Sequence, residues 1–251
     1  MKNIILVGSG NVATHLGIAL KNGNYNIIQV YSKSMKNAKI LAKKLDTHFT
    51  DDLTKLKTAD LIIVCVNDDV ISSVLSQIKN TAIVHTSGSI GLTVFKENFS
   101  HHGVFYPLQT FNKKVDLNIS DITFCIEGNS IKFENQLIKI AKALSSNVVK
   151  MNSHHRKQLH IAAVFSCNFS NHMYCIANEL LAENDIDFKI LLPLIKKTVA
   201  NLEEKNPKEL QTGPAKRKDT AIIKEHLAII KGKEIKELYK KISTNIIKLH
   251  D

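Results

Sequence analysis

The sequence has no tryptophan, 4 prolines and, among its 34 basic residues, only two arginines, Arg156 and Arg217. It also lacks a long apolar run: none approaches the ~20 residues that are needed to cross a bilayer. Hydrophobic residues make up 44% of the chain and charged residues 23%, which is typical of a folded globular protein and excludes a disordered or collagen-like chain. We therefore predict no membrane partner.

The scarcity of arginine bears on the kind of partner that the protein binds. The formal net charge is +11, and the surplus is divided almost equally between residues 1–150 (+6) and residues 151–251 (+5). A nucleic-acid-binding protein usually gathers its charge into a stripe or tail and uses arginine for bidentate contacts. The pattern favours a lysine-rich solvent surface over a nucleic-acid interface, and a basic surface for a polyanionic partner is the alternative.

The cysteines form no Cys-x-x-Cys pair. Each lies in an apolar stretch, where a free thiol packs as a small hydrophobic group: Cys65, Cys125, Cys167 and Cys175. Met1 leads directly into the strand-like run 4–7 without a charged leader or a cleavage site. We therefore predict a reducing compartment and a cytoplasmic location.

The first 150 residues alternate short β-rich runs with amphipathic helical patterns. The predicted strands are Asn3–Val7, Ile27–Tyr31, Leu61–Val66, Ala82–His85, Gly103–Phe105 and Ile122–Glu127. The predicted helices are Val12–Lys21, Met35–Leu45, Val70–Ile78 and Lys132–Leu144. Continuous Ile, Val and Leu runs between helices predict a parallel sheet covered on both faces, so residues 1–150 should form an α/β doubly wound domain of the Rossmann type.

Residues 151–251 contain no further β-like run and predict an all-α second domain, with helix breaks at residues 184–187, 206–207 and 213–214. The run His154–Glu183 predicts one long helix with a wide apolar face. Such a face is buried on more than one side, against its own domain or a second subunit. Because the helical half is too small to cover it alone, we predict a homodimer formed through these helices.

A glycine-rich turn, Gly8–Ala13, follows the first strand and opens the first helix with the spacing G-x-G-x-x-A. The first glycine permits the tight turn, the second lets a pyrophosphate approach the backbone, and the alanine permits close packing of helix on strand. The helix N-terminus then faces the anion. The predicted cofactor-binding residues of this turn are Gly8, Gly10, Asn11 and Val12; an ordinary glycine-rich βα turn is the alternative.

The end of the second strand decides which dinucleotide is bound. An NAD site usually places Asp or Glu there for the ribose hydroxyl. This chain has Ser32-Lys33-Ser34, and the next acid is Asp46. Hydroxyl groups and a cation suit a 2′-phosphate, so we predict NADP(H), with Lys33 as counter-charge and Ser32 and Ser34 as hydrogen-bond donors. A surface lysine without this role is the alternative for Lys33.

Three more polar segments follow predicted strands, and ligands of an open α/β sheet bind at the carboxyl ends of its strands. We expect cofactor contacts from Val66 and Asn67, and substrate contacts from Ser87, Gly88, Ser89 and Pro107. Hydroxyls and N–H groups of the Ser87–Ser89 turn suit a carboxylate or carbonyl. A turn that only caps the next helix is the alternative.

Together these segments resemble a family of bacterial proteins that join an N-terminal Rossmann-like domain to a C-terminal helical domain of unknown function, within the 6-phosphogluconate dehydrogenase-like superfamily. The resemblance covers nearly the whole chain, through the segments 8–13, 66–68, 85–89, 103–111, 160–168 and 212–219, with His226 beyond. Relatives by fold include pyrroline-5-carboxylate reductase, ketopantoate reductase, 3-hydroxyisobutyrate dehydrogenase and the deazaflavin-dependent NADP reductases. The sequence departs from the family at Lys33, where Arg is common, at Lys218, where Gly is usual, and at Tyr106, where His is common.

The resemblance also implies catalytic residues on the long helix. In superfamily dehydrogenases, a Lys and an Asn at comparable places transfer a proton and orient the substrate. Here these places hold His160 and Asn168, eight residues apart, which an α-helix separates by a net rotation of ~80° and so leaves on one face. Histidine exchanges a proton near neutral pH, so we predict His160 as general acid/base and Asn168 as the substrate-orienting residue. A buried structural histidine is the alternative.

Arg217 stands out among the lysines of the second domain. It predicts planar recognition of a substrate carboxylate or phosphate, and a fork onto Asp219 or onto an acid of a partner chain is the alternative. His226 could face the same pocket. No set of residues has the spacing of metal ligands, because the pairs 101–102 and 154–155 place adjacent histidines on diverging sides.

The sequence thus predicts an NADP(H)-dependent oxidoreductase. It would transfer a hydride to or from a small carbonyl, imine or hydroxy-acid substrate between the two domains. The alternative is a non-catalytic NADP(H)-binding scaffold or redox sensor, since a Rossmann fold alone does not establish catalysis.

Overall fold

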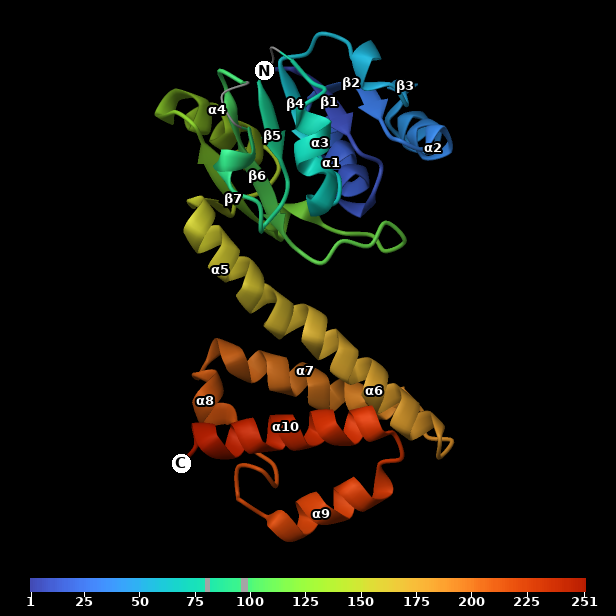
Figure 1. The fold of residues 1–251 in the computed structure, drawn as a ribbon, viewed down its shortest axis with the longest axis vertical. Coiled ribbons are helices and arrows are strands. Elements are labelled where there is room, and N and C mark those ends of the chain that lie inside the picture. The colour runs from blue at the N-terminus through green and yellow to red at the C-terminus, as the bar shows by residue number, and fades with distance from the viewer. Residues whose placement is uncertain (80–81, 96–98) are drawn as a thin grey trace. The chain divides into compact units, whose positions relative to one another are not determined.

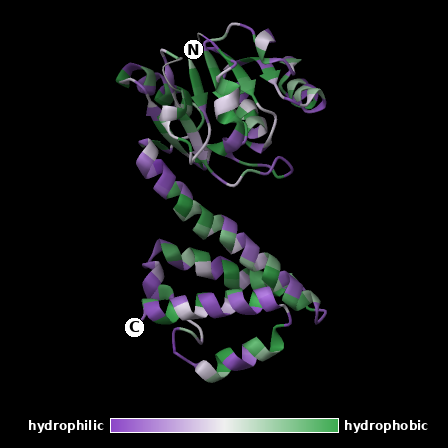
Figure 2. Ribbon diagram, viewed as in Figure 1, coloured by the Kyte–Doolittle hydropathy of each residue, from purple (hydrophilic) through white to green (hydrophobic). Residues whose placement is uncertain are grey.

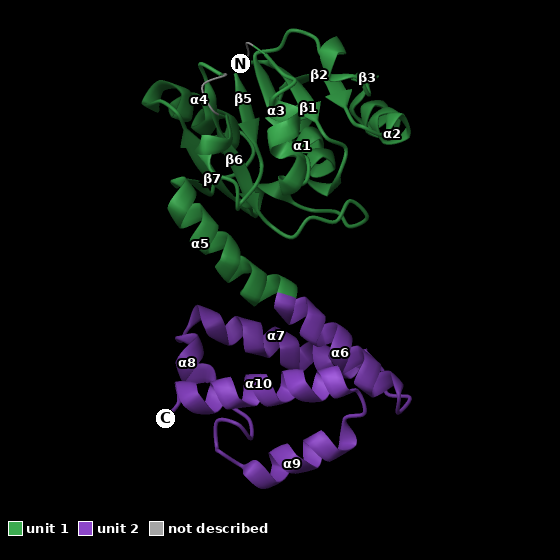
Figure 3. Cartoon of the chain, viewed as in Figure 1, with its two compact units in different colours: residues 1–168 green, residues 169–251 purple. Residues whose placement is uncertain are grey.

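The computed structural model describes residues 1–79, 82–95 and 99–251. The chain forms two compact units, residues 1–168 and residues 169–251 (Figure 3). The first unit carries a sheet with helices packed on it, and the second is helical (Figure 1). The predicted fold class, a Rossmann-type α/β part followed by an all-α part, is confirmed.

The described residues of the first unit form one eight-stranded sheet. Its strands are β1 (Asn3–Val7), β2 (Asn26–Tyr31), β3 (His48–Thr50), β4 (Leu61–Val64), β5 (Ile83–His85), β6 (His102–Leu108), β7 (Thr123–Gly128) and β8 (Val148–Lys150). They lie in the order β3-β2-β1-β4-β5-β6-β7-β8. The chain runs from β1 outward to β3 and then returns to β4 on the other side of β1. This switch point is where open α/β sheets bind their ligands.

One strand pair corrects the prediction of a parallel sheet. The pair β6–β7 is antiparallel, whereas the other neighbouring pairs are parallel. Residues 109–122 join these two strands with only the short 3-10 helix η4 (Ile119–Asp121) between them. Without a crossover helix the chain returns in the opposite direction. The strands β3 and β8 were not predicted, because these short edge strands are largely exposed and form no buried apolar run.

Helices cover both faces of the sheet. They are α1 (Asn11–Asn22), α2 (Met35–Leu45), α3 (Ile71–Leu75) and α4 (Ile131–Lys142), with the 3-10 helices η1 (Leu53–Lys55), η2 (Asp68–Val70) and η3 (Leu92–Phe95). Alternate residues of β1 enter different cores: Ile4 and Leu6 pack with residues of α1, α2 and α4, whereas Ile5 and Val7 pack with residues of α3 and η3. Figure 2 shows these strands mainly in the hydrophobic colour. Burial on both faces explains why the strands are continuous apolar runs rather than alternating ones.

The predicted long helix is present as one continuous helical run. It consists of α5 (Ser153–Ala163), a π-helix η5 (Val164–Phe169) and α6 (Ser170–Ala182). The first unit ends inside this run, after Asn168, whereas the predicted boundary at residue 150 coincides with the end of β8.

The second unit continues with η6 (Phe188–Leu191), α7 (Leu192–Ala200), η7 (Asn201–Glu203), α8 (Pro207–Leu210), α9 (Thr220–Ile229) and α10 (Lys233–Leu249). In the part of the chain that the structure describes, no helix combines the length and the hydropathy of a transmembrane span.

Candidate functional site

The glycine-rich turn has the geometry of a dinucleotide-binding loop. Gly8 follows β1 with a φ of +128°, and a Cβ added there would lie 2.2 Å from the backbone oxygen of Cys65. Only glycine fits both conditions. A Cβ added at Gly10 would meet nothing within 4 Å, and no described side chain caps the first turn of α1. The N-terminus of α1 therefore faces open space, and these residues fit a pyrophosphate group.

The first residue after β2 contacts this turn. The hydroxyl of Ser9 donates to the hydroxyl of Ser32 over 2.8 Å. Ser34 caps α2 and accepts from the N–H of Asn37, while Lys33 is exposed. Both serine hydroxyls act as acceptors in these bonds, so each keeps a proton that it can donate to a phosphate oxygen.

The predicted contacts after β4 and β5 differ in exposure. Val66 is half-buried in the apolar core of one sheet face and Asn67 is exposed. The hydroxyl of Ser87 accepts from the N–H groups of Ser89 and Ile90, each at 3.0 Å. This geometry matches the alternative in which the turn is a local cap, although the hydroxyl proton of Ser87 is still available to a ligand.

A tyrosine–histidine pair lies against the same turn. The hydroxyl of Tyr106, on β6, lies 3.0 Å from Nδ1 of His160 on α5. A Cβ added at Gly88 would lie 2.7 Å from that nitrogen and 2.8 Å from Cζ of Tyr106. Gly88 is therefore required for the close approach of the turn, the strand and the helix. The turn belongs to the carboxyl edge of β5, so the pair lies where the fold predicts a ligand.

Burial fixes the protonation state of Tyr106 and of a nearby histidine, His85. Burial raises the pKa of Tyr106 to about 12, so that its phenol keeps its proton throughout the physiological range. Burial, followed by the positive charge of Arg156, lowers the pKa of His85 to about 3. Nδ1 of this neutral ring accepts from the N–H of Ser87 over 3.2 Å. His85 therefore acts as a fixed acceptor that orients the turn.

Sequence reasoning missed a buried ion pair that anchors α5. Arg156 is fully buried, forms an ion pair with Glu127 of β7 and donates to the carbonyl of Ile90 over 2.6 Å. The carboxylate of Glu127 also accepts from the N–H and the hydroxyl of Ser153 at the start of the helix. The scarcity of arginine was the signal that could have found this residue, but it directed attention to Arg217 instead.

Asn168 lies in the π-helix η5 and is exposed. A π turn takes up more residues than an α turn, so the net rotation between His160 and Asn168 is smaller than the ~80° of a regular α-helix. Single π turns inside α-helices are frequent at functional sites. Pro107 is buried within β6, which extends three residues beyond the predicted strand end at Phe105, to Leu108.

The predicted residues of the second unit lie on α9 and the turn before it. Arg217 is exposed and, among the described residues, forms no ion pair. The alternative for Arg217, a fork onto Asp219, is absent: that carboxylate caps α9 by accepting from the N–H of Ile222. Nδ1 of His226 lies 2.8 Å from the hydroxyl of Tyr239. In the described part of the chain, no group of three or more His, Cys, Asp or Glu side chains could hold a metal ion.

Comparison with known proteins assigns both parts of the chain. Residues 3–87 match the family model described as NADP oxidoreductase, coenzyme F420-dependent, and residues 122–246 match a domain of unknown function, DUF2520. A solved structure from Bacteroides fragilis, described as an NADP oxidoreductase, is 38% identical over 98% of each chain, with a TM-score of 0.91. No curated protein matches the sequence.

Two more distant structures share the fold. A protein from Thermotoga maritima is 23% identical over 98% of this chain and 99% of its own, with a TM-score of 0.78. The 1-pyrroline-5-carboxylate reductase of Streptococcus pyogenes is 14% identical over 99% and 98%, with a TM-score of 0.67. The cofactor in the name of the matching family, NADP, agrees with the cofactor predicted from the sequence. The chain belongs to the NADP oxidoreductase family.

Proposed function

We propose that this protein is an NADP(H)-dependent oxidoreductase that reduces a small carbonyl or imine, or oxidises the corresponding hydroxy acid or amine. The observation that carries this proposal is the hydrogen bond between Tyr106 and His160 against the turn at Gly88. It places a proton-exchanging ring in the same unit as the phosphate-binding turn. When bound, NADPH supplies a hydride from its nicotinamide ring.

His160 supplies the proton that a reduction requires. Its imidazolium donates Nδ1–H to the hydroxyl oxygen of Tyr106, which leaves Nε2–H for the substrate. That proton goes to the carbonyl oxygen or imine nitrogen as the neighbouring carbon accepts the hydride, and the ring is left neutral. In the oxidative direction Nε2 of the neutral ring takes the proton back. Asn168 orients the substrate by hydrogen bonding, and further contacts within the first unit come from Ser87, Gly88, Ser89 and Pro107.

The 2′-phosphate of the cofactor is recognised after β2. Lys33 provides the counter-charge, and Ser32 and Ser34 donate hydroxyl protons. Titration of NADPH and NADH measures the preference, which we expect to favour NADPH. Comparable Kd values for the two nucleotides would contradict this assignment.

The central experiment compares the wild-type protein with His160→Gln. NADPH oxidation is followed with a panel of small ketones, keto acids and cyclic imines, and NADPH binding is measured separately. We expect turnover by the wild type and none by the variant, with equal NADPH affinity. A wild type that binds NADPH but turns over no member of the panel would favour the scaffold or sensor function, and unchanged turnover by the variant would remove His160 from the mechanism.

We also propose a homodimer formed through the helices of the second unit. Of residues 169–251, all of which are described, three are buried: Ala215, Ile230 and Ser243. Large apolar side chains of this unit are exposed, among them Ile190, Leu194 and Ile229 at 69%, 63% and 68%. A unit with so small a core needs another surface to cover these groups, and a second copy offers matching ones. Light scattering at low micromolar concentration should give the mass of a dimer, and the mass of a monomer would refute the proposal.

The cytoplasm is the proposed location. All four cysteines are free thiols in the structure, and burial raises the pKa of the Cys65 thiol to about 12, so this group is unreactive. Free thiols are the usual state in a reducing compartment.

A further inference from the structure

The loop after β6 is fastened to the helix that carries the phosphate-binding turn. The backbone N–H of Lys113 donates to the side-chain oxygen of Asn11, the first residue of α1, over 3.3 Å. One turn further along this helix, Nε2 of His15 lies 3.0 Å from the carbonyl oxygen of Asn112. The rings of His15 and Phe111 are also in contact, with centroids 5.7 Å apart. These contacts hold the backbone of residues 111–113 against α1.

The tethered loop brings two lysines to a pocket beside the glycine-rich turn. This pocket has a volume of about 280 Å³, and its lining residues come from the turn, α1, α2 and the loop: Ser9, Thr14, Asn37, Ile40, Leu41, Lys44, Lys113 and Lys114. Three of them are lysines and none is acidic. Cations gathered around one hollow repel each other, and an anion bound among them offsets this cost.

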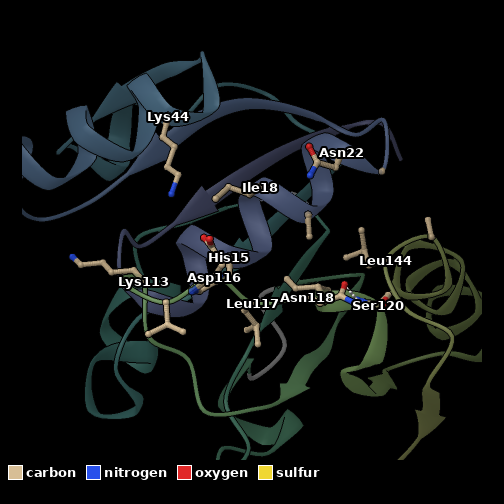
Figure 4. Close-up of a pocket in the computed structure, with 15 residues that line it drawn as sticks. His15, Ile18, Asn22, Lys44, Lys113, Asp116, Leu117, Asn118, Ser120 and Leu144 are labelled. Atoms are coloured by element: carbon tan, nitrogen blue, oxygen red, sulfur yellow. Dashed lines mark hydrogen bonds between the residues drawn. The ribbon is translucent and has the colours of Figure 1, made fainter.

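A second pocket, of about 550 Å³, runs along α1 and shares Lys44 and Lys113 with the first. Figure 4 shows these two lysines at one end of it and Asn22 and Leu144 at the other. Unlike the smaller pocket, the larger one contains an acid, Asp116. The pocket without an acid is the smaller one, which includes Ser9 of the phosphate-binding turn.

We propose that the loop after β6 is a second cofactor-binding segment, in which Lys113 and Lys114 bind a phosphate group of the nucleotide. This inference rests on the proposed function, because it requires that NADP(H) binds at the N-terminus of α1. It adds a basic site next to Ser9 that does not include Lys33 and that is formed through tertiary structure rather than through the βα turn. The phosphate is either the pyrophosphate or the 2′-phosphate, and the two sources are separable by experiment.

The test is a titration of the full-length protein with NADPH and with NADH, at low and at high salt. We expect Lys113→Gln/Lys114→Gln to raise the Kd about tenfold at low salt, and less at high salt, because exposed charges are screened. Weaker binding of NADPH alone assigns the lysines to the 2′-phosphate, and weaker binding of both nucleotides assigns them to the pyrophosphate. Charge reversal to Glu at both positions should deepen the loss.

The matched control removes two lysines from the other edge of the sheet. Lys57 and Lys79 are exposed and precede β4 and β5, so they lie at the amino ends of these parallel strands. Lys57→Gln/Lys79→Gln makes the same charge change and should leave both Kd values within about twofold. Unchanged affinities in the loop variant, or an equal loss in the control, would overturn the inference while the wild type still binds NADPH. A wild type that binds neither nucleotide would instead overturn the proposed function.

Discussion

The hydroxyl of Tyr106 lies 3.0 Å from Nδ1 of His160, although 54 residues separate them in the chain. Because the pKa of Tyr106 is raised to about 12, its hydroxyl stays protonated and serves both states of the ring. Its oxygen accepts from Nδ1–H both when the ring is charged and when it is neutral, so the neutral ring carries its lone pair on Nε2. The tyrosine thus directs Nε2 to the substrate in either state.

Removing this hydroxyl should impair turnover without affecting the cofactor. We expect Tyr106→Phe to lower kcat about tenfold or more, since the histidine loses the bond that orients it, and to shift the pH profile of kcat. The Kd for NADPH should not change. Tyr25→Phe is the control, because Tyr25 lies before β2 at the other edge of the sheet. An unaltered pH profile in Tyr106→Phe would show that the phenol has no part in proton transfer.

Gly88→Ala should separate the turn from the tyrosine–histidine pair. The new methyl group would lie 2.7 Å from Nδ1 of His160, so the ring or the turn must move. Overpacking of this kind costs about 1–3 kcal/mol, and we expect turnover to fall with it. Gly232→Ala is the matched control, because its nearest contact is an ordinary 3.4 Å. Denaturant unfolding and steady-state kinetics measure the two effects, and wild-type activity in Gly88→Ala would argue against a functional pair.

Arg156→Met should destabilise the first unit strongly. The substitution leaves the carboxylate of Glu127 without its buried counter-ion, and breaking such a pair costs about 3–5 kcal/mol. A double variant that also carries Glu127→Gln should recover part of this loss. Arg217→Met, at the exposed arginine, should change the free energy of unfolding by no more than ~0.5 kcal/mol. Equal effects of the two arginine substitutions would contradict the structural role of Arg156.

His85 should make the protein sensitive to acid. Its pKa is lowered from 6.5 to about 3 in the folded state, so the unfolded chain binds a proton more readily between these values. The stability that the neutral ring contributes is therefore complete above pH 6.5 and is lost progressively as the pH falls toward 3. Between pH 7 and pH 5 the free energy of unfolding of the wild type should fall by about 2 kcal/mol more than that of His85→Asn. The side-chain oxygen of this asparagine can still accept from the N–H of Ser87. Equal losses of unfolding free energy in the two proteins would contradict the lowered pKa of His85.

Much of the fold was predictable because local sequence patterns specify it. The runs 4–7 and 61–64 are buried on both faces and therefore continuous in hydrophobicity, and Ser34 caps the predicted helix at Met35. The direction of β7 was not predictable, since nothing in an apolar run shows which way its neighbour runs. The absence of a crossover helix after Leu108 decides it.

The candidate site was predictable only in part. The sequence selected His160 through a resemblance and treated Tyr106 as a departure from the family, whereas the structure joins the two. It also gave weight to Arg217, which is exposed, and none to Arg156, which is fully buried. The type of a residue shows what it can bind, but its burial and partners depend on strands and helices distant in sequence.

The sequence by itself determined the phosphate-binding turn, the α/β order of the first part and the helical second part, because each follows from the spacing of neighbouring residues. Only the tertiary structure decided that β6 brings Tyr106 to His160, that β7 brings Glu127 to Arg156, and that the loop after β6 brings Lys113 to the N-terminus of α1. These contacts join residues 54, 29 and 102 positions apart. The packing of the sheet and its helices fixes such pairs, and no local pattern in the sequence encodes them.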